Sequence, residues 1–592
     1  MDVTPAPAPI VLTLTDTPVA RRVADLLGAD LHARAGRAAG DVAFDDAPEH
    51  LRALFAAGVP IVGLCAAGIL IRALAPLLGD KRLEPPVLAV APDGGAVVPL
   101  LGGHRGANAL ARRIADALGV VPAITTAGDA AFGVALDDPP PGWRLASPER
   151  AGPAMARLLA GEGARVEGEA PWLAALPRGT GVRVAATLRP AAADLRYAPQ
   201  VVALGVGASR GCPEAELAEL VREALAEADV APEAVAAVGT LDLKADEGAV
   251  VALARSLGAP LRLFDAARLA AQEVATPSEV VRAATGTPSV AEAAALALAG
   301  SGGRLLLPKR KSAMATCALA LAPAPILAPP GRPRGRLAVV GIGPGQASWR
   351  TPEASRLVRE SEEVVGYGLY LDLLGPLARG KARADFPLGG EEDRCRHALE
   401  GAGEGRRVAL VCSGDAGIYA MAALVFELLD LPHGHPRAVS DAARRAELVV
   451  SPGVSALQAA AARAGAPLGH DFAALSLSDL LTPRADILRR LRAAAEGDFV
   501  LALYNPVSRA RRTLLDEARA ILLGHRDAAT PVLLARSLGR PDESLAVRAL
   551  GELRTDEVDM MTTVIVGSSN TRVVARGEGP RLYTPRGYER KR

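Results

Sequence analysis

The sequence is poor in aromatic residues, in cysteine and in net charge. Aromatic residues fill 3% of its 592 positions, and 67 Lys and Arg residues are balanced by 66 Asp and Glu residues, which leaves a net charge of +1. This balance gives no support for broad binding to nucleic acid or to a membrane surface, so we expect neither partner. The five cysteines are scattered, without a CxxC pair: Cys65, Cys212, Cys317, Cys395 and Cys412. Such a set favours a reducing compartment, the cytoplasm, and argues against disulfides and a metal site.

Long apolar runs are also missing. No apolar stretch of about 18 residues stays free of charges and of Pro and Gly breaks, so we expect no membrane-spanning helix. The N-terminal stretch has no basic region ahead of its apolar part, and we therefore expect no signal peptide. Hydrophobic residues make up 50% of the chain, enough for several cores. A chain of this length predicts three to five domains of roughly 100–200 residues each.

A proline-rich stretch divides the chain. The segment PAPILAPPGRPRG, at 323–335, contains five prolines, which disfavour helix and sheet and suit an extended linker. We place the main domain boundary there. A tail is expected at 576–592, with its last residues, 586–592, disordered.

Short apolar runs alternate with amphipathic helical patterns on both sides of the linker. Strands are expected at 59–64, 86–91, 201–207, 235–241, 337–343, 408–414, 447–453 and 499–506, and helices at 107–119 and 214–228. Strand–turn–helix repetition predicts a multidomain α/β protein with mainly parallel sheets. Ligands of such sheets bind at the carboxyl ends of the strands, so the turns that follow the strands are the candidate sites.

The turn GIGPG, at 341–345, is glycine-rich. It lacks the Lys-Ser/Thr pair of a nucleotide P-loop and fails the GxGxxG spacing of dinucleotide sites, so taken alone it is equally compatible with a turn that binds nothing. Four further strand ends open into small or polar residues: VCSGDAGIYAMA (411–422), SPGVSALQAAAARAG (451–465), ALYNP (502–506) and TTVIVGSSN (562–570). Small residues let a ligand approach the backbone, so we expect the five turns to line one crevice.

These motifs resemble the tetrapyrrole methylases over 336–575. GYGLYLDLLGPL (366–377), SGDAGIYAMA, SPGVSALQAAAARAGAPLGHDF and LYNPVSRAR are most similar to the precorrin-3B C(17)-methyltransferase family of cobalamin biosynthesis. The resemblance implies two α/β lobes, about 336–452 and 453–575, that hold S-adenosylmethionine between them. It further implies methylation of ring carbon 17 of a corrin precursor, contraction of the macrocycle, and a homodimer through this part. Another methyltransferase of the pathway, such as the C(11) enzyme, remains an alternative.

The resemblance also assigns residues to the cofactor. Pro344 lies in the first loop, which closes over the cleft. Ser413, Gly414, Asp415 and Ile418 correspond to the loop that receives the methionine part, where Asp415 would accept a hydrogen bond from the ammonium group. A second interpretation of Asp415, compatible with the first, is that it caps the N-terminus of a helix.

Further positions correspond to contacts along the rest of the cofactor. Ser455 and Ala456 match a backbone contact pair, and Asn505 and the stretch 537–539, which ends at Gly539, match contacts near the adenine. The family often has GDP where this chain has Gln346-Ala347 after GIGPG. The first loop therefore lacks a carboxylate, and we assign it no acid–base role.

The first part contains a lone histidine, His104, at a strand-to-helix turn beside Asn108. A histidine in such a turn is a candidate catalytic group, although a structural or solvated role is the commoner one. The stretch 68–129 resembles the cobalt-precorrin-5A hydrolase family, which opens a lactone on the corrinoid ring and releases acetaldehyde. That family commonly has GHxGGAN, and Gly103–Asn108 is one glycine shorter.

The resemblance to the hydrolase family continues to about residue 320. It rests on GVGASRGCPEAEL (205–217), GTLDLKADEGAVVALA (239–254), TGTPSVAEAAALALAG (285–300) and LLLPKRKSAMAT (305–316). It implies an N-terminal and middle region at 1–197 and a C-terminal domain at 198–322.

Lactone opening needs an activated water and a cation or donor for the developing oxyanion. His104 is the candidate base, and the candidate cations are Arg72, Lys81, Lys244 and Lys309. Lys244 is preferred because it stands at a strand end, with Glu247 as a possible ion-pair partner; all four are equally explained as solvated surface groups. Two hypotheses follow: a fused bifunctional enzyme, or a methylase attached to a non-catalytic corrinoid-binding or carrier module, which the shortened motif favours.

Overall fold

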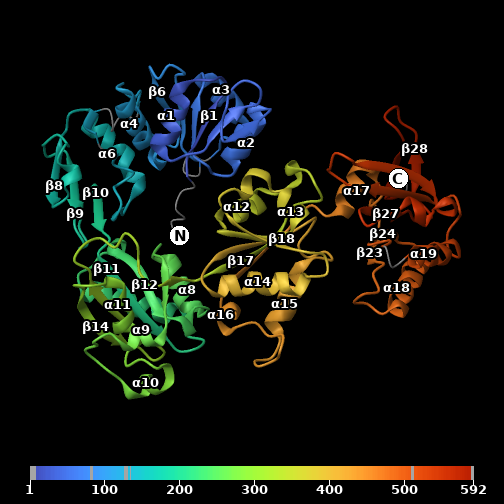
Figure 1. Ribbon diagram of the computed structural model, residues 1–592. Helices are drawn as coiled ribbons and strands as arrows, with labels where there is room; N and C mark the ends of the chain where they lie inside the picture. Colours follow the sequence, from blue (N-terminus) through green and yellow to red (C-terminus); the bar gives the residue numbers. More distant parts are fainter. Residues whose placement is uncertain (1–7, 80–83, 126–130, 134, 509–511, 589–592) are drawn as a thin grey trace. The chain divides into compact units, whose positions relative to one another are not determined.

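The computed structural model describes residues 8–79, 84–125, 131–133, 135–508 and 512–588 (Figure 1). The chain divides into two compact units. The first contains Met1–Arg336, Leu399–Arg407 and Val439–Glu447, and the second contains Leu337–Ala398, Val408–Ala438 and Leu448–Arg592. Helices pack on sheets in both units, and the predicted multidomain α/β class is confirmed. Within these described ranges, no helix is both long and apolar enough to cross a bilayer.

The first sheet of the first unit carries the GHRGAN turn. Its strand order is β3 (Val42–Phe44), β2 (Leu31–Arg34), β1 (Ile10–Thr13), β4 (Ile61–Leu64), β5 (Val87–Val90) and β6 (Val97–Leu101). All neighbours are parallel except β6, which is antiparallel to β5. Alternate strand residues face opposite layers: one with α2 (Ala47–Ala56) and α3 (Ala67–Leu74), the other with α1 (Pro18–Leu27) and α4 (Ala107–Leu118).

A small second sheet follows. Its order is β7 (Trp143–Leu145), β10 (Leu195–Pro199), β9 (Val182–Ala186) and β8 (Ala164–Gly168), and α6 (Ala151–Leu159) packs against it. The fully buried Tyr197 donates its hydroxyl proton to the carbonyl of Leu136 at 2.6 Å. Trp172 packs edge-on against Tyr197, with ring centroids 4.9 Å apart. Aromatic rings thus add to the mainly aliphatic core of this sheet.

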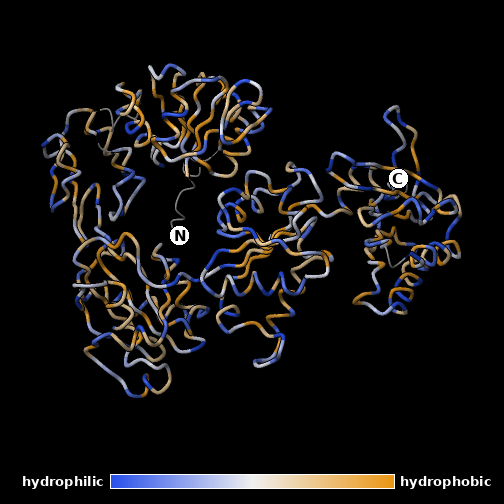
Figure 2. Tube along the Cα trace, viewed as in Figure 1, coloured by the Kyte–Doolittle hydropathy of each residue, from blue (hydrophilic) through white to orange (hydrophobic). Residues whose placement is uncertain are grey.

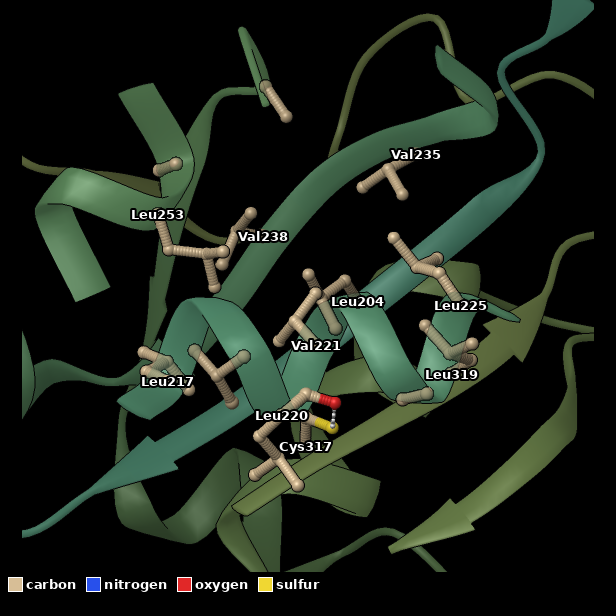
Figure 3. Close-up of a cluster of buried hydrophobic side chains, with 14 of the residues drawn as sticks. Leu204, Leu217, Leu220, Val221, Leu225, Val235, Val238, Leu253, Cys317 and Leu319 are labelled. Carbon is tan, nitrogen blue, oxygen red and sulfur yellow. Dashed lines mark hydrogen bonds between the residues drawn. The ribbon is translucent and has the colours of Figure 1, made fainter. Parts of the chain in front are cut away.

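The third sheet has strand order β14 (Arg304–Lys311), β15 (Ala315–Leu321), β11 (Val202–Ala208), β12 (Val235–Leu241), β13 (Leu261–Phe264) and β16 (Arg332–Pro333). One face packs against α7 (Glu214–Glu227) and α8 (Gly248–Ser256), where the thiol of Cys317 donates to the carbonyl of Leu220 (Figure 3). The other face packs against α9 (Ala266–Ala270) and the alanine-rich α11 (Val290–Ala299), while α10 (Glu279–Thr285) carries no buried residue. Gly205 lets α11 approach closely, since a Cβ there would lie 1.9 Å from the carbonyl oxygen of Ala291.

The proline-rich segment is packed against this third sheet. Arg332 and Pro333 pair with β13 as a short antiparallel edge strand, and the amide of Ile326 donates to the carbonyl of Gln200 at 2.9 Å. The expectation that this segment does not join a sheet, because its prolines disfavour sheet, is wrong at these two residues. A proline is tolerated on an edge strand because only one side of the strand needs donors.

The second unit begins with a five-stranded sheet of order β19 (Ala382–Phe386), β18 (Glu363–Tyr367), β20 (Arg407–Cys412), β17 (Arg336–Gly341) and β21 (Glu447–Ser451). Figure 1 shows α12 (Pro352–Glu360) and α13 (Gly368–Asp372) on one face, and α14 (Glu391–Gly403) and α15 (Met421–Asp430) on the other. The short α16 (Asp441–Arg444) precedes β21 in the sequence and is counted with the first unit. The strands form the hydrophobic centre of this layer, with more polar helices outside (Figure 2). We call this part the first lobe.

The second lobe holds a sheet of order β23 (Phe472–Ser476), β24 (Val500–Tyr504), β27 (Thr562–Val566), β25 (Pro531–Arg536) and β26 (Ser544–Ala549). Leu501 and Leu503 face α18 (Arg484–Glu496) and α19 (Thr513–Leu523), while Val500 and Ala502 face α17 (Ala456–Ala464). Only β23 and β24 are parallel; the other three neighbouring pairs are antiparallel. The expectation of mainly parallel sheets is wrong here, because a buried apolar run has the same pattern whichever way its neighbour runs.

A three-stranded sheet completes this lobe. Its order is β22 (Gly465–Ala466), β29 (Arg581–Tyr583) and β28 (Arg572–Val574). β29 lies inside the segment expected as a tail, and Leu582 is buried. The segment from 576 to 584 is therefore part of the folded lobe.

Candidate cofactor site

The first two glycine turns of the first lobe are joined by their main chains. The amide of Gly343 donates to the carbonyl of Gly414 at 3.1 Å, and the amide of Gly414 donates to the carbonyl of Gly343 at 2.9 Å. Both residues have left-handed backbones, with φ of 78° and 70°, a conformation that glycine adopts without strain. The ends of β17 and β20 are thereby held side by side.

The turn after β21 meets the same two turns. A Cβ on Gly453 would lie 2.2 Å from the carbonyl oxygen of Gly414 and 2.8 Å from that of Gly341. Only a residue without a side chain permits backbones to approach so closely. Three of the five predicted turns therefore converge at one edge of the sheet.

Asp415 ties this junction together. Its Oδ1 accepts a hydrogen bond from the amide of Gly417 at 2.8 Å, and its Oδ2 accepts one from the amide of Gly453 at 3.0 Å. Helix α15 begins only at Met421, with Ala420 at the N-cap, so the helix-cap interpretation of Asp415 is wrong. Each carboxylate oxygen keeps a lone pair, and Asp415 remains a possible acceptor for a cationic ligand group.

The same loop reaches the second lobe through Tyr419. Its hydroxyl donates to the carbonyl of Ala474 on β23 at 2.9 Å, and its ring lies 5.2 Å from that of Tyr504. Tyr419 is half exposed and has a φ of 51°, a conformation costly for a bulky residue. Ser413 is half-buried and Ile418 is 38% exposed, so both side chains are accessible beside this contact.

Helix α17 begins at the same place. Ser455 forms a capping box with Gln458, and the hydroxyl of Tyr504 accepts a hydrogen bond from the amide of Leu457 at 2.9 Å. Burial raises the pKa of the Tyr504 phenol above its usual value, and the nearby Asp415 carboxylate adds to the rise. The amides of Ser455 and Leu457 are occupied by these contacts. Among the contacts of the described residues, the amide of Ala456 remains available to a ligand.

Two further predicted positions have strained backbones at strand ends of the second lobe. Asn505, after β24, has a φ of 49°, and Ser537, after β25, has a φ of 51°. The Asn505 side chain is exposed and donates to the hydroxyl of Ser476 at 3.0 Å, which leaves its amide oxygen as an acceptor. Strained backbone of this kind collects at ligand sites.

The first loop and the turn at 537–539 are in direct contact. A Cβ on Gly345 would lie 2.5 Å from the carbonyl oxygen of Leu538, and one on Gly539 would lie 2.7 Å from the amide nitrogen of Gln346. The carbonyl of the buried Pro344 accepts a hydrogen bond from Nε of Arg540 at 3.3 Å. Pro344 and Gly539, separated by almost 200 positions, thus belong to one contact region.

The fifth predicted turn lies elsewhere. β27 is antiparallel to β24, with Leu501 opposite Val566, so the GSSN segment follows β27 at the edge where β24 begins. Ser569 donates from its amide and hydroxyl to Asp498, the residue two positions before β24. The expectation that all five turns line one crevice is wrong for 567–570, because it assumed parallel strands.

The structure therefore gathers Pro344, Ser413, Gly414, Asp415, Ile418, Ser455, Ala456, Asn505 and Gly539 around the junction of the two lobes. Sequence reasoning missed Tyr419 and Tyr504, although both lie in quoted motifs. It also missed Trp349, Arg463 and Arg540, because their contacts join distant segments; Arg463 lies in the quoted motif SPGVSALQAAAARAG, whose pattern does not indicate these contacts.

A separate cavity lies at the GHRGAN turn of the first unit. Its volume is about 370 Å³, and it is lined by Gly103, Gly106, Asn108, Ala109, Arg112, Gly133, Ala135, Asp138, Pro140 and Trp172. His104 lies within the 3-10 turn Gly103–Arg105, directly before α4. The turn and the start of α4 thus form one wall of a concave site.

The predicted cations do not gather at this cavity. Arg72 donates to the carbonyl of Gly68 in its own helix, and Lys309 donates from Nζ to the carbonyl of Thr276 at 2.7 Å. Lys244 is not among the lining residues, and Lys81 lies outside the described residues.

The expected ion pair between Lys244 and Glu247 is replaced by another contact. Glu247 accepts from the amide of Gly211 at 3.0 Å and lies 3.6 Å from Arg210. β11 and β12 are parallel neighbours, so the turn after β11 brings Arg210 to Glu247 from a neighbouring strand end.

Comparisons with known proteins match three separate stretches of the chain. Residues 336–554 match the family model for tetrapyrrole (corrin/porphyrin) methylases, residues 202–320 that for the cobalamin synthesis G C-terminus, and residues 49–129 that for the cobalamin synthesis G N-terminal region. A precorrin-3B C(17)-methyltransferase from Sinorhizobium sp is 48% identical over 255 residues, which cover 43% of this chain and 97% of that protein. A probable cobalt-factor III C(17)-methyltransferase from Salmonella typhimurium is 42% identical over 43% of this chain and 99% of its own length.

A solved structure also matches the second half. The crystal structure of the methyltransferase CobJ is 40% identical, covers 42% of this chain and all of its own, and superimposes with a TM-score of 0.39. The chain also contains matches to both cobalamin synthesis G regions. Because it covers 97% of the Sinorhizobium protein at 48% identity, the chain belongs to the tetrapyrrole (corrin/porphyrin) methylase family.

Proposed function

We propose that residues 336–584 use S-adenosylmethionine to methylate ring carbon 17 of a corrin precursor, precorrin-3B or its cobalt form, with contraction of the ring. The observation that carries this proposal is the convergence of four glycine- and polar-residue turns on one junction between two lobes. The C(17)-methyltransferases from Sinorhizobium and Salmonella support the choice of ring carbon over the C(11) alternative.

The polar groups at the junction fit the groups of the cofactor. Asp415 would accept from the ammonium, the amide of Ala456 at the start of α17 would donate to the carboxylate, and Asn505 and Gly539 would lie near the adenine. When bound, S-adenosylmethionine supplies a methyl group already activated by the positive sulfur. The chain then needs to orient the acceptor carbon and exclude water, which the close-packed turns are suited to do.

The direct test is a product assay. The full chain is incubated with S-adenosylmethionine labelled in its methyl group and with precorrin-3B or its cobalt form, and the macrocycle is analysed by mass spectrometry. We expect one added methyl group at carbon 17, and the comparison of both substrates identifies the cobalt requirement. A macrocycle without label would refute the proposal.

For the first 322 residues we propose the opening of the lactone of a cobalt-precorrin-5A-type intermediate. The cavity beside the GHRGAN turn favours this activity, because a small ester ring needs a concave site with polar walls. His104 is the proposed base, with Asn108 beside it. The released acetaldehyde can be trapped and measured.

A non-catalytic role is the alternative for this part. Lys309 has its ammonium occupied by Thr276, and Lys244 lies away from the cavity, so neither stabilises an oxyanion at that turn. A corrinoid-binding or carrier module would show binding without acetaldehyde release. A His104→Ala variant that retains full release would also exclude His104 as the base.

We further propose that the methylase part forms a homodimer. Exposed apolar side chains on the second lobe support it, namely Leu480, Leu481 and Phe472, of which Leu481 is 98% exposed. Light scattering on the purified chain measures the mass directly, and a monomer at micromolar concentration would refute this assembly.

A further inference from the structure

Arg463 connects the two lobes of the methylase half. It lies near the end of α17, and its Nε donates to Oε1 of Glu543 at 2.8 Å. Its Nη2 donates to Oε1 of Gln346 at 3.2 Å, and its guanidinium carbon lies 4.5 Å from the ring centroid of Trp349. Gln346 and Trp349 follow the first glycine loop, so a single side chain of the second lobe binds two residues of the first.

Glu543 extends this contact to the turn at 537–539. Its second carboxylate oxygen, Oε2, accepts a hydrogen bond from the amide of Gly539 at 2.6 Å. The Glu543 side chain is 22% exposed and that of Arg463 is 39% exposed. A partly shielded ion pair with additional hydrogen bonds holds its geometry better than an isolated surface pair.

Trp349 contributes apolar packing as well as a contact with the guanidinium of Arg463. It packs against the second-lobe core that contains Leu457, Leu538 and Leu582. A guanidinium over an indole ring adds about 0.5–2 kcal/mol of attraction, depending on its exposure to water. The segment that follows the first loop is thus held by Trp349, which packs on the second lobe, and by Arg463, which belongs to that lobe.

We infer that Arg463 is a positioning residue that makes the first loop and the 537–539 turn close on the cofactor as one piece. We call Arg463, Glu543, Gln346 and Trp349 the arginine clasp. Pro344 and Gly539, which flank the clasp, are both proposed cofactor contacts, so this inference rests on the proposed use of S-adenosylmethionine. Arg463 itself is not assigned a contact with the cofactor.

Gln346, the residue directly after GIGPG, gives the clasp a neutral acceptor, because an amide oxygen and not a carboxylate meets Nη2 of Arg463. An aspartate at this position would have a shorter side chain and add a second carboxylate beside Glu543. The longer, uncharged side chain of Gln346 reaches Arg463, so Glu543 is the carboxylate in the clasp that pairs with the charge of Arg463.

The test measures binding and local dynamics in the full chain. We expect Arg463→Ala to weaken binding of S-adenosylhomocysteine at least tenfold by calorimetry and to raise KM for S-adenosylmethionine similarly, while kcat changes less than threefold. Arg463→Lys, which keeps the charge but not the planar fork, should fall between Ala and the wild type. In the free protein, hydrogen exchange should accelerate at 341–350 and 537–543 but not at 484–504 in the Ala variant.

A matched control is Arg489→Ala. Arg489 lies in α18, is 72% exposed and pairs with Asp486, so its removal should leave both measurements unchanged. Binding by Arg463→Ala within twofold of wild type, or unchanged exchange in both segments, would overturn the inference. A wild type that binds no S-adenosylhomocysteine would instead refute the proposed cofactor, while the exchange measurement would still test the coupling of the two segments.

Discussion

A Cβ atom on Gly453 would lie 2.2 Å from the carbonyl oxygen of Gly414. This distance is far below any normal contact, so a side chain at position 453 must push the third turn away from the second. The amide of Gly453 would then also leave Oδ2 of Asp415, which it now meets at 3.0 Å. The packing of two backbones and the position of a proposed ligand acceptor therefore depend on the same glycine.

The first prediction concerns that glycine. We expect Gly453→Ala to reduce methyl transfer more than tenfold and to lower the stability of the unit by about 1–3 kcal/mol, as overpacking does. Labelled methyl transfer and urea unfolding measure the two effects. Gly577→Ala is the control, because a Cβ there meets nothing within 4 Å. Equal activity of the two variants would contradict the close approach.

The second prediction concerns the charge of Asp415. A charge-assisted hydrogen bond contributes about 1.5–3 kcal/mol, so Asp415→Asn should weaken S-adenosylhomocysteine binding by roughly 10–150-fold. Calorimetric titration measures the dissociation constant. Asp471→Asn, at a carboxylate that is 79% exposed, should bind as the wild type does. An unchanged dissociation constant for Asp415→Asn would remove Asp415 from the cofactor site.

The third prediction separates the two proposed activities. Ala109 lies on the wall of the cavity at the GHRGAN turn, so Ala109→Phe should fill it and abolish acetaldehyde release. Methyl transfer should remain at the wild-type rate because the methylase half has its own fold and site. Arg113→Ala, on the same helix but not among the lining residues, serves as the control. Full acetaldehyde release by the Phe variant would place lactone opening elsewhere.

The fourth prediction concerns stability at low pH. Burial of Glu292 raises the pKa of its carboxyl, but hydrogen bonds from the amides of Lys309 and Thr276, the Thr276 hydroxyl and the Lys309 charge outweigh it, and the pKa lies below its usual value. A lowered pKa in the folded state stabilises the fold above the unfolded value of about 4.3, and this stabilisation is lost as pH falls below it.

We therefore expect Glu292→Gln to cost about 1–3 kcal/mol at pH 7 and progressively less as the pH falls below about 4.3. Urea unfolding at several pH values measures the difference. Glu279→Gln, at a side chain that is 83% exposed, should change stability by less than about 0.5 kcal/mol. A cost for Glu292→Gln that does not depend on pH would show that the carboxylate charge is not involved.

Local patterns predicted the elements themselves. The expected strand at 235–241 is β12 without a change of bounds, and the expected helix at 107–119 is α4 with one residue fewer. Both follow from periodicities that a single segment contains. The four turns that converge could also be found, because small residues after apolar runs mark strand ends.

Contacts between distant segments could not be predicted in this way. The direction of β27 is set by its pairing with β24 and β25, and neither strand's sequence encodes it. The same holds for Asp415, whose amide partners include Gly453, 38 residues away, and for Arg463 and Gln346, which are 117 residues apart. These features depend on how the turns pack in three dimensions. Local sequence patterns do not predict which distant segments will be in contact.

The pairing of β29 with β22 has a consequence for folding during synthesis. Thr584 donates its hydroxyl proton to the carbonyl of Pro467, 117 residues earlier, and β29 lies between β22 and β28. The second lobe therefore cannot complete its smaller sheet until the ribosome has delivered residues 581–584. The strands of the three sheets in the first unit have all been made by residue 333, so these sheets can form much sooner. A newly made chain should thus pass through a stage in which the first unit is already protected from proteases while the segment around Gly465 is still open to cleavage.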